Sequence, residues 1–191
     1  DLTALQQADI VVYSHPAFER WASEALKSLR AGRPTVQAVE YNRSVLTDRE
    51  ISFLKGLEDQ KTVGEFLTVH GSPRDRDEYI LTKEAAVENL HIVEDDHRTV
   101  KICFFGHCHL PMVIGDELIE TVFRETRTVA LDRQKIYLVN PGGVGQPRDR
   151  CPLTSFALFD PERWELTITR LPYPIEETQQ QIREAGLDES L

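Results

Sequence analysis

Two histidines, His107 and His109, stand two residues apart after a short apolar run, and they are the residues best suited to chemistry. The run over residues 102–105 is typical of a strand buried on both faces, and it ends at Gly106. Side chains two apart on extended chain point the same way, so both imidazoles can converge on one point while Cys108 faces away. Because neutral imidazole is a common metal ligand, this strand end is a candidate metal site. Taken alone, two loop histidines are more often solvated or hydrogen-bonded, and two further stretches of the chain favour the metal.

Two other predicted strands end in loops of the same character. Residues 63–70 are expected to form a strand that leads into His70, Gly71, Ser72 and Pro73, with Arg74 next. Residues 136–139 lead into Asn-Pro-Gly-Gly-Val-Gly-Gln-Pro-Arg-Asp over 140–149. Small residues allow the backbone to approach a ligand closely. The three strand ends therefore indicate one shared site.

Two arginines of these loops are candidates for contact with a substrate. Arg148 stands beside the glycine-rich loop and can bind a phosphate group through two N–H groups. Arg74 follows His70 closely and is expected to line the pocket. For Arg148, a structural ion pair is the alternative interpretation.

Other kinds of site are excluded by spacing. Gly143 and Gly145 are followed by Arg148 where the dinucleotide fingerprint requires its third glycine. The run also lacks the Lys-Ser/Thr pair of a P-loop, and no G-x-S-x-G sequence is present for a serine hydrolase. The cysteines do not have the spacing of a zinc finger or ribbon.

Helices are expected mainly in the first half of the chain and strand hairpins in the second. Helical periodicity and capping residues predict four helices, at about 16–30, 48–57, 82–90 and 175–186. Thr47 and Glu50 are expected to form a capping box at the start of the second helix, and Thr82 is expected to cap the third. Two hairpins are expected, one from residues 118–123 and 126–131, the other from 155–159 and 164–171. In the last strand apolar and polar residues alternate, which is typical of one buried and one wet face.

Length, charge and cysteine content narrow the class of protein. The 191 residues predict a single domain spanning 1–191. A net charge of −10 argues against an extended nucleic-acid footprint, but metal ions could supply positive charge for a small phosphorylated substrate. No apolar run approaches the roughly 18 residues that a membrane span needs. Three cysteines without C-x-x-C spacing favour reduced thiols and a cytoplasmic location.

The three loops that begin at His70, Gly106 and Asn140 follow one another along the chain. In this order they resemble the loops of the calcineurin-like metallophosphoesterases, in particular the small bacterial members. The resemblance covers most of the chain, from the helix near residue 16 to Arg-Glu-Ala-Gly-Leu at 183–187. It implies an α/β fold, a four-layer α/β/β/α sandwich with a two-metal site at strand ends. The implied activity is hydrolysis of a phosphate ester by a hydroxide that two metal ions activate.

The resemblance also assigns roles to individual residues. His70 and His107 would ligate one divalent ion and His109 the other, with Mn, Fe, Zn and Ni all compatible with such ligands. Gly71 would flank the site, and Gly71, Arg74 and Arg148 are the candidate substrate-binding residues. Residues 140–143 would brace the neighbouring loop.

The sequence departs from the family pattern in its first part. The D-x-H, G-D and G-N-H sequences of the family, which include the catalytic histidine, do not stand upstream of His70. The chain starts at Asp1 without methionine, so we expect strand-helix units upstream in the natural protein and an inactive chain without them. The alternatives are a catalytically silent binding or scaffold protein on the same fold, and a structural site in which three histidines hold one metal. Substrate, metal identity and oligomeric state do not follow from the sequence.

Overall fold

A computed structural model describes residues 10–12, 40–117, 119–121 and 123–187. The chain divides into two compact units, of which the first spans 1–14 and 59–172 and the second spans 15–58 and 173–191. The single domain expected over 1–191 stays a prediction. The helix expected at about 16–30 lies outside the described residues.

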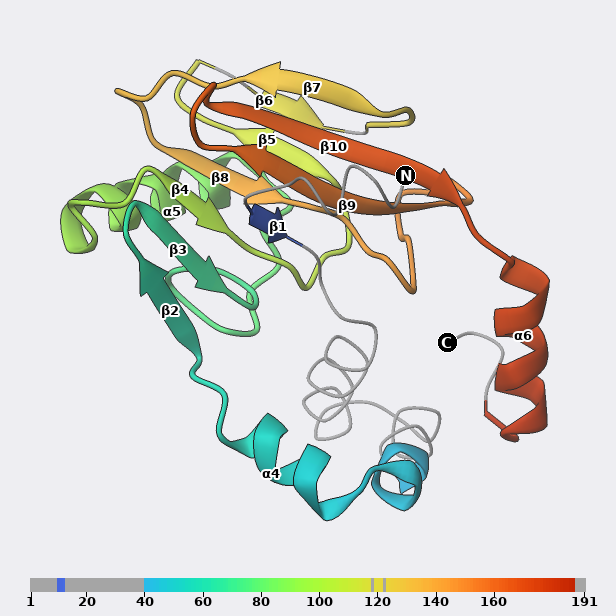
Figure 1. The fold of residues 1–191 in the computed structure, drawn as a ribbon. Helices are drawn as coiled ribbons and strands as arrows, with labels where there is room; N and C mark the ends of the chain where they lie inside the picture. Colours follow the sequence, from blue (N-terminus) through green and yellow to red (C-terminus); the bar gives the residue numbers. More distant parts are fainter. Residues whose placement is uncertain (1–9, 13–39, 118, 122, 188–191) are drawn as a thin grey trace. The chain divides into compact units, whose positions relative to one another are not determined.

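The first unit contains a six-stranded sheet with the order β2-β3-β4-β8-β5-β6 (Figure 1). Its strands are β2 Gln60–Val63, β3 Phe66–Val69, β4 Ile102–Phe104, β8 Tyr137–Asn140, β5 Met112–Ile114 and β6 Ile119–Thr121. The neighbours β3, β4 and β8 run parallel, whereas the other pairs are antiparallel. Three adjacent strands therefore deliver their following loops to one edge of the sheet.

An antiparallel four-stranded sheet with the order β1-β9-β10-β7 belongs to the same unit. Its strands are β1 Ile10–Val12, β9 Leu153–Asp160, β10 Glu165–Pro172 and β7 Arg127–Ala130. The predicted β9–β10 hairpin is confirmed, and β10 alternates as expected, with Leu166 and Ile168 fully buried.

The hairpin predicted from residues 118–123 and 126–131 is wrong. β6 pairs with β5 in the six-stranded sheet, whereas β7 pairs with β10 in the other sheet. Between them the chain crosses from one sheet to the other, and Phe123 is buried in the core that the sheets share. The partner strand β5 is only three residues long, too short to show a period in the sequence.

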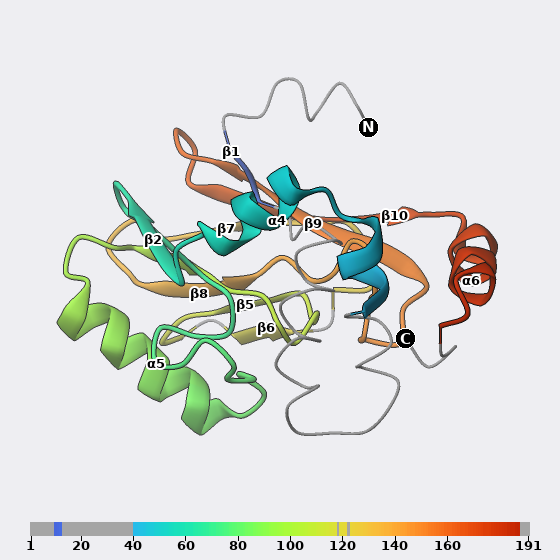
Figure 2. The same cartoon turned by 90° about the horizontal axis from the view of Figure 1, so that it is seen from below.

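Two apolar clusters hold the layers of this unit together. One lies between the sheets and combines Ile102, Phe104 and Val139 with residues such as Phe159 and Leu166. The other lies between the six-stranded sheet and helix α5 Lys83–Asp96, which runs along one side of this sheet (Figure 2). The helix buries Ala86, Leu90 and Val93. Alternate residues of β4 thus face opposite layers, and the predicted α/β class with two packed sheets is confirmed.

Helix boundaries follow their predicted capping residues. In the second unit, α4 Asp48–Lys55 begins with the expected capping box of Thr47 and Glu50, and α6 Ile175–Glu184 lies where the last helix was predicted. Thr82 caps α5 through Ala85 N, but α5 continues past the end predicted near residue 90. Val93 extends the buried stripe by another turn, which explains the greater length.

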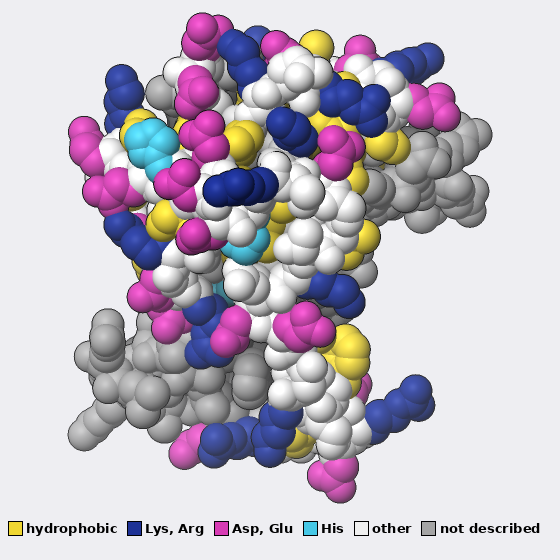
Figure 3. Space-filling view, turned by 90° about the vertical axis from the view of Figure 1, so that its left-hand side faces the viewer, with side chains coloured by type: hydrophobic (Ala, Val, Ile, Leu, Met, Phe, Trp, Pro, Cys, Tyr) yellow, Lys and Arg dark blue, Asp and Glu magenta, His cyan; other side chains and the backbone are white. Residues whose placement is uncertain are grey.

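One face of the described part of the molecule is mixed in charge. Acidic and basic side chains are interspersed over the face drawn in Figure 3. None of the helices in the described ranges is long and apolar enough to cross a membrane.

Candidate functional site

The three predicted loops meet at the ends of β3, β4 and β8. In the register of these strands Thr68 lies beside Phe104, and Phe104 lies beside Val139. The main chain continues the connection past the strands, because Gly106 N donates to His70 O at 2.7 Å and Phe105 N donates to Val139 O at 2.9 Å. The loops that carry His70 and His107 are therefore joined directly.

His70 and His107 form a close pair at this edge. The distance from His70 Nε2 to His107 Nδ1 is 2.9 Å, and the ring centroids are 4.7 Å apart. Both side chains are buried. Burial lowers the pKa of His70 below its ordinary value of 6.5. The negative charge of Asp77 opposes this shift, and the positive charge of Arg76 adds to it. His70 is thus neutral at pH 7, the form in which imidazole binds a metal.

His109 lies beside a different partner. Its Nδ1 is 2.8 Å from Gln146 O, and since a carbonyl oxygen only accepts, Nδ1 carries the hydrogen and Nε2 the lone pair in the neutral ring. The backbone of His107 and His109 is left-handed, with φ of 63° and 56°. The expectation that both rings point the same way from extended chain is therefore wrong, because the chain turns sharply at each histidine.

Asn140 braces the loop that contains both of these histidines. Its fully buried amide donates to Gly106 O at 2.8 Å and to Cys108 Sγ at 3.1 Å, and its Oδ1 accepts from Gly142 N at 2.9 Å. Gly142 has φ +84°, and a Cβ there would lie 2.6 Å from Ser155 Cβ, so no larger residue fits. The brace expected from residues 140–143 is present.

Arg148 lies at the same loop. Its guanidinium donates to His107 O at 3.3 Å and to Gln146 Oε1 at 2.9 Å. Two of its N–H groups therefore hold protein atoms next to the histidine pair. Binding of a substrate phosphate by Arg148 stays a prediction.

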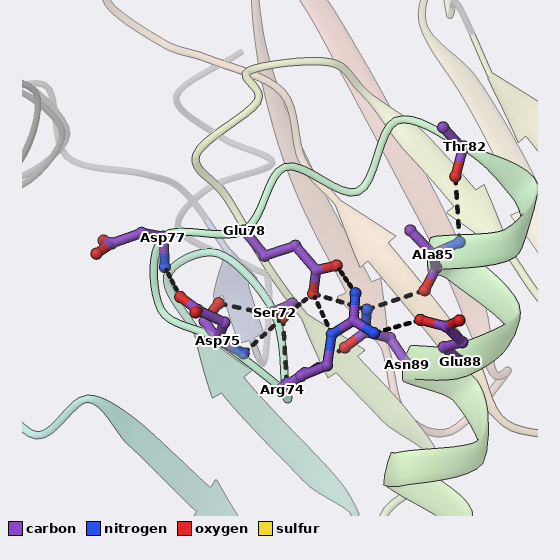
Figure 4. Close-up of polar contacts among 9 residues, drawn as sticks. All are labelled: Ser72, Arg74, Asp75, Asp77, Glu78, Thr82, Ala85, Glu88 and Asn89. Atoms are coloured by element: carbon purple, nitrogen blue, oxygen red, sulfur yellow. Dashed lines mark hydrogen bonds and ion pairs between the residues drawn. The ribbon is translucent and has the colours of Figure 1, made fainter. Parts of the chain in front are cut away.

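Gly71 and Arg74 both make contacts within or beside the loop that follows β3. A Cβ on Gly71 would lie 2.3 Å from Arg76 O, so close packing of the loop on itself requires glycine. The guanidinium of Arg74 forms ion pairs with Glu78 and Glu88 (Figure 4). Direct roles of Gly71 and Arg74 in substrate binding stay predictions.

The histidine pair fits a shared metal ion in part. When two nitrogens bind the same metal ion at about 2.1 Å and the N–metal–N angle is about 90°, the nitrogens lie about 3 Å apart. The 2.9 Å between His70 and His107 agrees with that spacing. The carbonyl that holds His109 Nδ1 is also typical of ligating histidines. Within the described ranges, however, no group of three or more His, Cys, Asp or Glu side chains is placed to hold a metal, so ligation by these histidines stays a prediction.

Two polar features near the site were missed in the sequence. Asn89 lies on the apolar side of α5, and Arg170 continues the buried series of Leu166 and Ile168 on β10. A polar residue at a core-facing position indicates buried hydrogen bonds, and this signal could have identified both. Arg170 pairs with Asp149, and the two side chains are 1% and 2% exposed. Asn89 contacts Arg74 and Glu78.

The chain is similar to solved structures and to a curated relative, including the following three proteins. A metallophosphoesterase from Sphaerobacter thermophilus superposes with a TM-score of 0.73 and 31% identity, covering 90% of this chain and 71% of that one. The hypothetical protein PH1004 from Pyrococcus horikoshii shares the fold, with a TM-score of 0.67, 16% identity and coverage of 99% and 73%. The uncharacterized protein MJ0912 from Methanocaldococcus jannaschii is 28% identical over 160 residues, which span 81% of this chain but 62% of the relative. No protein-family model matches the chain.

Proposed function

The chain belongs to the calcineurin-like metallophosphoesterases, and we propose that the complete protein is a metal-dependent phosphoesterase. The observation that carries the proposal is the His70–His107 pair, whose ring nitrogens lie 2.9 Å apart beyond two adjacent parallel strands. A buried histidine pair at strand ends, with His70 neutral, is suited to metal binding and has no evident role in the hydrophobic core.

In this proposal the complete site uses two divalent ions, Mn, Fe, Zn or Ni. His70 and His107 would hold one, and His109 would belong to the other. Bound ions would supply Lewis acidity toward phosphoryl oxygens and activate water for in-line attack. The protein keeps His70 neutral by burial, fixes the tautomer of His109 through Gln146 O, and supports the His107 backbone through Arg148.

The charge of the chain supports a proposal for the substrate class. The chain carries a net charge of −10, and its charged side chains are interspersed on the face of Figure 3, so an extended polyanion would gain little from that surface. We propose a small phosphorylated substrate, drawn to metal ions and to Arg148. Three cysteines that form no disulfide fit a reducing compartment, and we propose a cytoplasmic location.

The test is hydrolysis of bis-p-nitrophenyl phosphate by the complete protein, including any segment that precedes Asp1. Mn²⁺-dependent turnover is expected for the wild type, and His107→Ala should reduce kcat/KM by at least about a hundredfold. His91→Ala, at an exposed position of α5, is the matched control and should retain activity. Full Mn²⁺-dependent activity in His107→Ala would refute the proposal. If the folded wild type binds Mn²⁺ and hydrolyses no phosphate ester, the catalytically silent alternative is supported instead.

A further inference from the structure

A cluster of polar side chains fixes the loop that follows β3 (Figure 4). We call it the Glu78 cluster; it consists of Ser72, Arg74, Glu78, Glu88 and Asn89. Glu78 lies at its centre and accepts from Ser72 Oγ at 2.5 Å, from Asn89 Nδ2 at 3.0 Å and from Arg74 Nε at 3.3 Å. Arg74 closes the cluster by pairing with both Glu78 and Glu88.

Asn89 anchors this cluster to helix α5. Its side chain is fully buried and donates to Ala85 O at 2.9 Å as well as to Glu78. Its Oδ1 accepts from the backbone N of Arg74 at 3.2 Å. Since α5 packs on the six-stranded sheet through Leu90 and Val93, the loop is tied to the apolar cluster that also contains Cys103 of β4.

The charges of the cluster are balanced within it. Burial raises the pKa of Glu78, but hydrogen bonds from Arg74, Ser72 and Asn89 outweigh burial and leave the pKa below its ordinary value. Hydrogen bonds to Glu78 and Glu88 raise the pKa of Arg74. Ionised Glu78 therefore keeps Arg74 bound to the loop, which leaves this guanidinium little capacity for a substrate phosphate.

Both ends of the loop contact His107. At one end, the His70 ring lies 4.7 Å from the His107 ring, centroid to centroid, at 60°. At the other end, Tyr79 follows Glu78 and its ring lies 4.0 Å from the His107 ring at 45°. The shape of residues 70–79 therefore determines which groups touch the His107 imidazole.

We propose that Glu78 is a positioning residue for the His107 imidazole. With Ser72, Arg74 and Asn89 it sets the shape of the loop, and the loop places His70 and Tyr79 against His107. This inference rests on the proposed function, in which His107 holds a metal ion. It assigns Arg74 to the loop and not to the substrate.

The test compares Glu78→Gln with Glu117→Gln in the complete protein. Glu117 is the matched control, because it also pairs with a cation, Lys135, but lies outside the Glu78 cluster. The first readout is the set of His107 imidazole C–H resonances in the metal-free protein, assigned by their loss in His107→Ala. The second readout is Mn²⁺ affinity by calorimetry.

Glu78→Gln should shift the His107 resonances and weaken Mn²⁺ binding about tenfold, the size typical of residues that orient a metal ligand. Glu117→Gln should change neither. A Glu78→Gln protein that melts at lower temperature but keeps both wild-type readouts would overturn the inference, because Glu78 would then serve stability alone.

Tyr79 provides the second pair of variants if Glu78→Gln fails to fold. Tyr79→Leu removes the ring contact and should change both readouts, whereas Tyr79→Phe keeps the ring and should restore Mn²⁺ affinity. Equal affinity in the two variants would overturn the inference. If the wild type binds no Mn²⁺, the proposed function fails, and the resonances alone then decide whether Glu78 positions His107.

Discussion

An ion pair and a cluster of charged side chains involve the loops next to the histidine pair, and they differ in solvent exposure. The Asp149–Arg170 pair follows the glycine-rich loop, and its side chains are 1% and 2% exposed. The Glu78 cluster follows His70, and there the side chains of Arg74, Glu78 and Glu88 are 44%, 14% and 57% exposed. Both clusters hold a loop of the site, but only the first is sealed from solvent.

The difference in exposure separates two kinds of consequence. A charge left alone at a buried position cannot be rehydrated, so loss of one partner destabilises the whole fold. In a partly exposed cluster, water and salt replace the lost contacts, so the effect stays within the loop. We therefore expect Asp149–Arg170 to govern folding and the Glu78 cluster to govern local geometry. Four substitutions test this contrast.

The largest effect is expected for Asp149→Asn. It leaves the Arg170 guanidinium buried without its counter-charge and should lower the free energy of unfolding by about 3–5 kcal/mol. Urea denaturation followed by circular dichroism measures this loss. Asp59→Asn, which removes an exposed partner of Arg76, is the control and should remain close to wild type. A comparable loss of unfolding free energy in Asp149→Asn and Asp59→Asn would show that the buried pair and the exposed pair do not differ in this way.

Gly71→Ala should act on the loop by overpacking. A Cβ at this position would lie 2.3 Å from Arg76 O, so the loop must move, at a cost of about 1–3 kcal/mol. Mn²⁺ affinity should fall in the same variant, since residues 70–79 contact His107. Gly56→Ala meets its nearest atoms at an ordinary 3.5 Å and serves as the control. An unchanged stability for Gly71→Ala would show that the loop is not tightly packed.

Glu78→Gln should destabilise by about 1–2 kcal/mol at pH 7, through loss of charge-assisted hydrogen bonds. The pKa of Glu78 is lowered below its ordinary value of 4.5, so its stabilising contribution is complete above that pH and is lost as the pH falls through the lowered value. The stability difference between wild type and Glu78→Gln should therefore shrink at acidic pH. Denaturation curves at pH 7 and below about pH 4 measure it, and a constant difference would contradict the role of the charge.

The smallest effect is expected for Glu88→Gln. This carboxylate is 57% exposed and pairs with Arg74, whose side chain is itself 44% exposed, so the melting temperature should change by less than about 2 °C. Any change should vanish in about 1 M salt, because ions screen exposed pairs. A large drop in melting temperature that salt does not change would show that Glu88 behaves like the buried Asp149–Arg170 pair.

The sequence predicted the loops of the site because their signals are local. An apolar run that ends in glycine and histidine shows a strand end, and the alternation over 164–171 shows a strand with one buried face. Parallel pairing of β3, β4 and β8 then brings His70, His107 and Asn140 to one edge. The Thr47 and Thr82 caps were predicted for the same reason, because a cap involves only neighbouring residues.

Features that depend on distant partners could not be predicted in this way. β6 and β7 are close in sequence but pair with different sheets, a choice made by the whole core. The left-handed backbone of His107 and His109 is supported by contacts from Asn140 and Gln146, far along the chain. The Glu78 cluster likewise joins a loop to a helix, and only the polar Asn89 on an apolar side hinted at it.

The most direct test of the account is a crystal structure of the complete protein grown with Mn²⁺, with anomalous scattering recorded. An anomalous peak is expected about 2.2 Å from both His70 Nε2 and His107 Nδ1, with Tyr79 still against the His107 ring. Mn²⁺ bound elsewhere, with the two imidazoles still hydrogen-bonded to each other, would contradict it.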